Sequence, residues 1–187
     1  QIFILDDSET MRHSWDEMCQ LFAVLSRFAK PSDEDGIEIY FTMKHDVVKK
    51  SKKMTKLVDI VRKHKGNLNG SSNIKLCLDR ILKPYEQNLI AQKEYRAAHA
   101  VSASSDDQKP LTVYILTNGL WNGRADPTDS IRDMVSVLEQ CHCRSSQVGI
   151  QFIGFGNDEA ALARLDHYDD DLGLSMFVFR NFLMQRS

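Results

Sequence analysis

Three oxygen-bearing side chains alternate along a short polar segment near the start of the chain. Asp6, Ser8 and Thr10 follow the apolar run Ile2 to Leu5 and precede an amphipathic stretch. Carboxylate and hydroxyl oxygens are the ligands that hard cations such as Mg²⁺ prefer. The same residue types also cap helices by accepting hydrogen bonds from the free N–H groups of the first turn. Taken alone, the segment therefore indicates either a cation site or a helix cap.

Two later segments place further side-chain oxygens in polar turns. Ser72 lies in Gly70-Ser71-Ser72-Asn73, just before a helical pattern, and Asn118 follows the β-rich run Leu111 to Leu116. In open parallel sheets, ligands bind at the edge where the strands end. We therefore expect the oxygens of all three segments to meet at one edge of a sheet.

In this order, the segments resemble the von Willebrand factor A (VWA) family over nearly the whole chain. Asp6-x-Ser8-x-Thr10 is similar to the DxSxS metal-binding signature of that family. Ser72 stands in its second element, normally a Gly-Thr turn before a helix, and Asn118 stands where the family has the Asp of Thr-Asp-Gly.

The resemblance implies a metal-ion-dependent adhesion site (MIDAS). Ser8, Thr10 and Ser72 would bind a divalent cation with their hydroxyls, and Asp6 would hold it closely or through water. An acidic side chain of a protein partner would fill the open coordination position. The chain is then a protein-interaction module and not an enzyme, because such a bridge needs no nucleophile or general base.

Asn118 is the main departure from the family pattern. An amide in place of a carboxylate keeps an oxygen but removes one negative charge. Since the affinity of a site for hard cations follows its ligand charge, we expect Mg²⁺, or Ca²⁺ or Mn²⁺ in its place, to bind weakly or not at all.

Two alternatives remain open. A phosphatase of the haloacid-dehalogenase type would use Asp6 as its nucleophile, but it needs a second Asp where Ser8 stands. A receiver domain is a poorer match, because the run Ile37 to Phe41 continues into Thr42 and not into an Asp. The other alternative is a metal-free scaffold that recognises partners through its loops.

Apolar runs alternate with helical patterns from one end of the chain to the other. This alternation predicts a Rossmann-like α/β fold: a doubly wound, mainly parallel sheet of about six strands with helices on both faces. No linker or internal repeat divides residues 1–187, so we expect a single VWA-like domain. Pro84 is expected to kink or end a helix that begins at Ile74. Strands are expected at Ile2 to Leu5, Ile37 to Phe41, Leu111 to Leu116, Val148 to Phe155 and Phe177 to Phe179.

Composition limits the classes of partner. The formal net charge of −2 gives no whole-chain attraction to nucleic acid. The longest apolar runs are far below the roughly 20 residues that span a bilayer, so membrane insertion is not expected. Four cysteines without CxxC spacing favour a reducing, intracellular compartment, but the location itself cannot be predicted from this sequence.

Two further features each allow two interpretations. Trp121, in the loop after Leu116, either anchors a partner with an exposed indole or packs the loop onto the domain. The basic run Lys44 to Lys65 is interpreted as a solvated helix face and not as a nucleic-acid site, because no aromatic residues lie between its lysines.

Overall fold

A mainly parallel sheet lies at the centre of the protein. The computed structural model describes residues 1–29, 36–43, 49–99, 108–171 and 179–180. The strand order is β3-β2-β1-β4-β5-β6. β1 (Ile2–Leu5) pairs in parallel with β2 (Ile37–Phe41) on one side and β4 (Leu111–Thr117) on the other, and β4 pairs in parallel with β5 (Val148–Gly154). The runs at 2–5 and 111–116, both expected as strands, are the two central neighbours of this sheet.

Both edge strands are short. β3 (Lys49–Ser51) runs antiparallel to β2, and β6 (Phe179–Arg180) pairs in parallel with the end of β5. The last expected strand, Phe177 to Phe179, falls mostly on residues outside the described part. The number of about six strands therefore stays a prediction.

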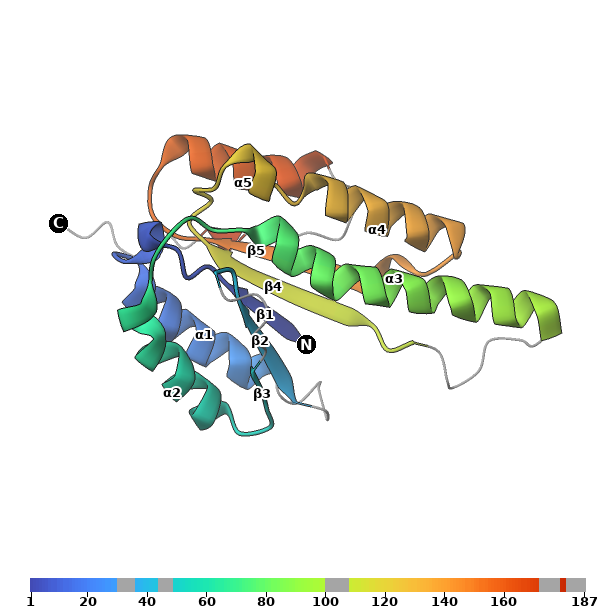
Figure 1. Cartoon of the computed structure of the whole chain (residues 1–187), viewed down its shortest axis with the longest axis horizontal. Coiled ribbons are helices and arrows are strands. Elements are labelled where there is room, and N and C mark those ends of the chain that lie inside the picture. The colour runs from blue at the N-terminus through green and yellow to red at the C-terminus, as the bar shows by residue number, and fades with distance from the viewer. Residues whose placement is uncertain (30–35, 44–48, 100–107, 172–178, 181–187) are drawn as a thin grey trace.

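Helices cover both faces of the sheet, as the alternating pattern predicts (Figure 1). One layer consists of α1 (Trp15–Ala29) and α2 (Met54–His64). The opposite layer consists of α3 (Ile74–His99), α4 (Thr128–Gln140) and α5 (Glu159–Asp171). The doubly wound α/β prediction is confirmed.

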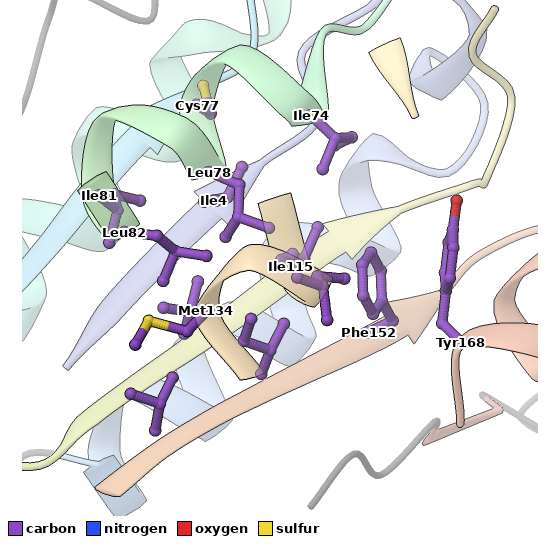
Figure 2. Close-up of a cluster of buried hydrophobic side chains, with 14 of the residues drawn as sticks. Ile4, Ile74, Cys77, Leu78, Ile81, Leu82, Ile115, Met134, Phe152 and Tyr168 are labelled. Carbon is purple, nitrogen blue, oxygen red and sulfur yellow. The ribbon is translucent and has the colours of Figure 1, made fainter. Parts of the chain in front are cut away.

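Each layer of helices buries its own face of the sheet. Along β1, Phe3 and Leu5 belong to the core under α1 and α2, whereas Ile4 belongs to the core under α3 and α4. This alternation follows from the period of two in a β-strand. Figure 2 shows Ile4 of β1 beside Leu78 of α3, and Ile115 of β4 near Phe152 of β5. Burial of each such side chain stabilises the fold by about 1.5–3 kcal/mol.

The basic run 44–65 differs from the expected single helix face. β3 occupies part of it, and only from Met54 onward is the chain in α2. Lys49 and Lys50 lie on the edge strand, where Lys50 Nζ is 2.8 Å from Glu38 Oε1 on the neighbouring strand. Charged side chains on an edge strand discourage pairing with a further strand, which explains why a lysine-rich segment can occupy this position.

Pro84 does not end α3, contrary to one of the two expected effects. The helix is 26 residues long, and Pro84 lies inside it. Pro84 is exposed, and buried side chains on both sides of it, Leu82 and Leu89, attach the helix to the core. Packing of this kind offsets the lost backbone hydrogen bond. Despite this length, none of the helices in the described residues is both long and apolar enough to cross a membrane.

Candidate functional site

The candidate site lies where β1 and β4 end side by side. Leu5 is in register with Leu116, so Asp6 and Thr117 emerge together at the carboxyl ends of the two central strands. The backbone N–H of Asp6 donates to Leu116 O at 2.9 Å, which extends the pairing by one step. Asp6 is fully buried.

Hydrogen bonds to the carboxylate of Asp6 come from three segments, and the longest of them runs from Thr42 Oγ1 to Asp6 Oδ1 at 3.5 Å. Thr117 Oγ1 donates to Asp6 Oδ2 at 2.6 Å, and the N–H of Ser8 donates to Asp6 Oδ1 at 3.1 Å. Burial raises the pKa of Asp6 above its ordinary value, while bonds from Thr117 and Ser8 and the nearby hydroxyl of Ser72 lower it; burial has the larger effect. The site therefore holds a buried acid whose negative charge the protein alone stabilises incompletely.

The two hydroxyls of the DxSxT segment and the amide of Asn118 form a chain. Ser8 Oγ and Thr10 Oγ1 are 2.9 Å apart, and Thr10 Oγ1 donates to Asn118 Oδ1 at 3.3 Å. Because Thr10 donates to Asn118, its hydrogen bond with Ser8 has Ser8 as the donor. Asn118 Oδ1 also accepts from the N–H of Leu120 at 3.1 Å, so its amide oxygen points toward Thr10.

Ser72 contributes an oxygen from a third segment. It is 1% exposed, and its Oγ makes no hydrogen bond of normal geometry with the described residues, although it lies near enough to Asp6 to affect its pKa. A buried hydroxyl without a partner costs about 1–3 kcal/mol. Gly70 places this turn by accepting from the N–H of Glu9 at 3.2 Å. The fold thus brings Ser72 to the same rim as the first segment.

Asp7 faces away from this rim, as expected for the neighbour of Asp6 in an extended segment. Its Oδ1 accepts from Thr42 Oγ1 at 3.1 Å and from the N–H of Met43 at 2.7 Å. Its Oδ2 is 2.8 Å from His64 Nε2, and the His64 ring stacks on Phe41 with 3.9 Å between ring centroids. Asp7 is therefore engaged with β2 and α2 and adds no free carboxylate to the rim.

Trp121 is packed onto the domain, the second of its two interpretations. The indole is 6% exposed and lies parallel to the ring of Tyr168, with 6.4 Å between centroids. Arg164 of α5 donates from Nη1 to Gly119 O at 2.6 Å and to Trp121 O at 3.3 Å, and its guanidinium lies 5.4 Å from the indole centroid. A direct role of Trp121 in partner binding stays a prediction.

Gly119 is required by the close approach of the loop to α5. Its φ is +75°, and a Cβ at this position would lie 3.0 Å from Ala161 Cβ and from Ala161 O. Only glycine adopts this backbone conformation readily. This contact and Arg164 together fix the loop that carries Asn118.

Several residues around the site were not identified as functional from the sequence. Thr117 donates the shortest hydrogen bond to Asp6. It could have been identified from the register of two adjacent strands that both end in polar residues. His64, Thr42 and Arg164 come from elements far away along the chain. No short motif joins them to the DxSxT segment, so only the fold reveals their contacts.

The five residues expected to hold a cation lie on three segments at one rim: Asp6, Ser8, Thr10, Ser72 and Asn118. Their donors are hard oxygens, which fit Mg²⁺, Ca²⁺ or Mn²⁺ by type. Clusters of three or more His, Cys, Asp or Glu side chains that could hold a metal are absent from the described part of the chain. A cation at this rim would therefore depend on hydroxyl and amide oxygens beside one carboxylate.

Comparison with known proteins gives similarity in structure only. Neither a protein-family model nor a curated protein matches the sequence. The fold is similar to proximal thread matrix protein 1 (PTMP1) from the mussel byssus, in a structure with a zinc-occupied MIDAS motif (TM-score 0.52, 14% identity). A further PTMP1 structure aligns with a TM-score of 0.50 at 16% identity. The first alignment covers 96% of this chain and 43% of PTMP1, so the chain spans less than half of that protein.

At these identities the likeness shows the fold alone. The protein has a VWA-like α/β fold, as the sequence resemblance implies. The zinc-occupied MIDAS motif is a property of PTMP1.

The buried charge of Asp6 leads to a prediction about stability. We expect Asp6→Asn to raise the melting temperature of the metal-free protein by roughly 2–4 °C at pH 7, because about 1 kcal/mol changes Tm by that amount in a domain of this size. The amide keeps the shape of the side chain and an acceptor oxygen but carries no buried charge. Thermal unfolding in EDTA measures the effect, with the exposed Asp59→Asn as a control that leaves Tm unchanged.

The pH dependence of this difference has a definite sign. Because the folded-state pKa of Asp6 is raised above 3.8, the folded protein binds this proton more tightly than the unfolded chain does. When the pH falls through that raised pKa toward 3.8, Asp6 is protonated in the folded protein and its buried charge no longer destabilises the fold. The Tm advantage of Asp6→Asn therefore shrinks. An advantage that grows on acidification contradicts this account of the site.

Proposed function

We propose that residues 1–187 form a single VWA-like protein-interaction domain that binds its partner through a divalent cation at the rim. Asp6, Ser8 and Thr10 supply oxygens from the turn after β1, and Ser72 and Asn118 supply oxygens from two other turns. The observation that carries the proposal is the convergence of hydroxyl and amide oxygens around a buried carboxylate.

Two features of the rim support a cation. The charge of Asp6 is buried at an energetic cost, and the buried Ser72 hydroxyl has no partner of normal geometry among the described residues. A divalent ion would satisfy both groups at once, because it stabilises a carboxylate and accepts a hydroxyl oxygen as a ligand. Mg²⁺ is the first choice, with Ca²⁺ and Mn²⁺ as alternatives.

The charge balance of the rim favours weak cation binding and an acidic partner. Asp7 is turned toward His64 and Thr42, and Asn118 is neutral, so Asp6 is the only carboxylate of the proposed ligand set. A doubly positive ion there would keep an excess positive charge. A carboxylate from the partner would neutralise this excess and complete the coordination, so cation and partner would strengthen each other's binding.

We propose that Trp121 contributes to partner binding indirectly. Its indole and Arg164 hold the loop that carries Asn118 and the 37% exposed Leu120. This loop would present both residues beside the cation. The proposed interaction is with protein, and neither nucleic-acid binding nor insertion into a membrane is part of it.

The proposal excludes an enzymatic role. Ser8 stands where a phosphatase of the haloacid-dehalogenase type needs its second Asp, and its hydroxyl is bonded to Thr10. Asp6, the residue that would act as nucleophile, is buried and accepts three hydrogen bonds. A metal-free scaffold is the second candidate function, supported by the neutral amide of Asn118.

Restoring a carboxylate at position 118 tests the cation site. We expect titration calorimetry with Mg²⁺ to show weak binding to the wild-type protein and at least about tenfold tighter binding to Asn118→Asp, because a carboxylate adds ligand charge. The matched control is Asn122→Asp, which adds the same charge in the same loop. Asn122 Oδ1 accepts from the N–H of Arg124 and bonds none of the five ligands in the described structure.

Two outcomes contradict this prediction. Absence of Mg²⁺, Ca²⁺ and Mn²⁺ binding in both wild type and Asn118→Asp contradicts the cation site and favours the metal-free scaffold. An equal gain for Asn122→Asp contradicts a specific role of position 118.

A phosphatase assay tests the enzymatic alternative. We expect no turnover of a generic phosphomonoester in Mg²⁺, because the acid/base Asp is replaced by Ser8. Magnesium-dependent turnover that Asp6→Ala abolishes contradicts the binding-module proposal.

A further inference from the structure

A groove runs between α1 and α2. These two helices cover the face of the sheet opposite to α3, α4 and α5 (Figure 1). Ala23 of α1 and Met54 and Val58 of α2 supply apolar lining, and Arg27 and Arg62 supply one cationic side chain from each helix. The groove has a volume of about 150 Å³. An apolar cavity of about this size can hold a benzene-sized group, so there is room here for one large apolar side chain.

Two exposed hydrophobic residues lie on α1 beside the groove. Phe28 is 77% exposed, more than any other large hydrophobic side chain that the structure describes, and Val24 is 47% exposed. They are four residues apart, so they lie on the same face of the helix. Val24 directly follows Ala23, and Phe28 directly follows Arg27. Covering this apolar area would remove it from water at a gain of about 25 cal/mol per Å².

The groove belongs to the most basic part of the molecule. Residues 49–65 contain eight Lys and Arg and only one carboxylate, Asp59, in a chain whose net charge is −2. Lys50 and Lys65 are paired with Glu38 and Asp16. Four other cations on these two helices form no ion pair with another described residue: Arg27, Lys56, Arg62 and Lys63.

This surface is separate from the cation rim. Ser51, just before α2, pairs with Ile37 at the start of β2, whereas the rim lies where the parallel strands end. α1 begins after the turn of the rim and runs away from it, so Phe28 in its last turn lies at the far end of the helix. Binding at the groove therefore needs neither the metal nor the ligands of the rim.

We propose that the groove between α1 and α2 is a second docking site, which binds an acidic amphipathic helix of a partner protein. One apolar side chain of the partner enters between Ala23 and Val58, and its neighbours one turn away cover Val24 and Phe28. Carboxylates on the flanks of that helix face Arg27 and Arg62. A helix fits because apolar anchors at i, i+4 and i+7 in a groove are a recurrent mode of recognition. A bilayer surface attracts the same charges but does not fill a narrow concave groove.

Fluorescence polarisation with a synthetic helical peptide tests the site in EDTA, which keeps the rim metal-free. The probe has Leu along one face and Glu elsewhere. Two control peptides replace all Glu by Lys or all Leu by Ser. We expect saturable binding of the Leu/Glu peptide alone, weakened by added salt because the exposed charges are screened.

Two pairs of matched variants locate the binding surface. We expect Phe28→Ala and Arg62→Glu each to weaken binding by about tenfold or more, because the first removes a large apolar contact and the second turns attraction to the carboxylates of the peptide into repulsion. Tyr95→Ala and Arg132→Glu remove an exposed aromatic and an exposed cation from α3 and α4, and we expect them to have no effect. Asp59→Lys, which adds positive charge at the groove, is expected to tighten binding.

Three outcomes overturn this proposal. The first is no saturable binding of the Leu/Glu peptide. The second is that the α1–α2 variants and the α3–α4 variants lose peptide affinity equally. The third is sedimentation of the protein with phosphatidylserine vesicles, dependent on Phe28, without competition by the peptide; this result assigns the surface to a membrane. None of them bears on the metal titration of Asn118→Asp, so the two proposals fail independently.

Discussion

The buried carboxylate of Asp6 is the constraint on which the arrangement of the rim depends. A charge at this depth is costly unless hydrogen-bond donors or an opposite charge surround it. The main donors are Thr117 at the end of β4, which the parallel register of β1 and β4 places beside Asp6, and the backbone N–H of Ser8, two residues further along the chain. Thr42 Oγ1 adds a longer bond of 3.5 Å. The protein leaves the charge partly uncompensated, since the pKa of Asp6 remains raised. This imbalance is what a bound cation would relieve.

The neighbouring carboxylates Asp6 and Asp7 have different surroundings because they project to opposite sides of an extended segment. Asp7 bonds to Thr42 and His64 and so joins the first turn to β2 and to the end of α2. Asp6 faces the hydroxyls of Thr117, Ser8 and Ser72. A substitution at Asp7 should therefore affect the positions of elements, whereas a substitution at Asp6 should affect the chemistry of the rim. Buried groups that are poorly satisfied by the protein itself are frequent at functional sites, where stability is lower than it could be.

The sequence predicts the central features of this fold because their signals are local. Alternating apolar runs and amphipathic stretches indicate the parallel sheet and its covering helices, and polar turns after 2–5 and 111–116 indicate the rim.

β3 was missed because an edge strand of three residues, two of them lysines, carries neither an apolar run nor alternation. The continuity of α3 through Pro84 depends on core contacts of Leu82 and Leu89, which propensity does not contain. For Trp121, burial is determined by Arg164 and Tyr168 of α5, more than 40 residues away. The ligand roles of the five rim residues and the identity of a partner remain predictions, since neither follows from the fold alone.

The central claim is that the rim holds a divalent cation, and anomalous diffraction from crystals soaked in Mn²⁺ tests it most directly. The measurement should be made on both the wild-type protein and Asn118→Asp, so that weak affinity does not hide the site. The account predicts an anomalous peak within bonding distance of the Ser8 and Thr10 hydroxyls and beside Asp6, stronger in Asn118→Asp than in wild type. The absence of a peak at this rim in both proteins, at Mn²⁺ concentrations that saturate other sites in the same crystal, contradicts it.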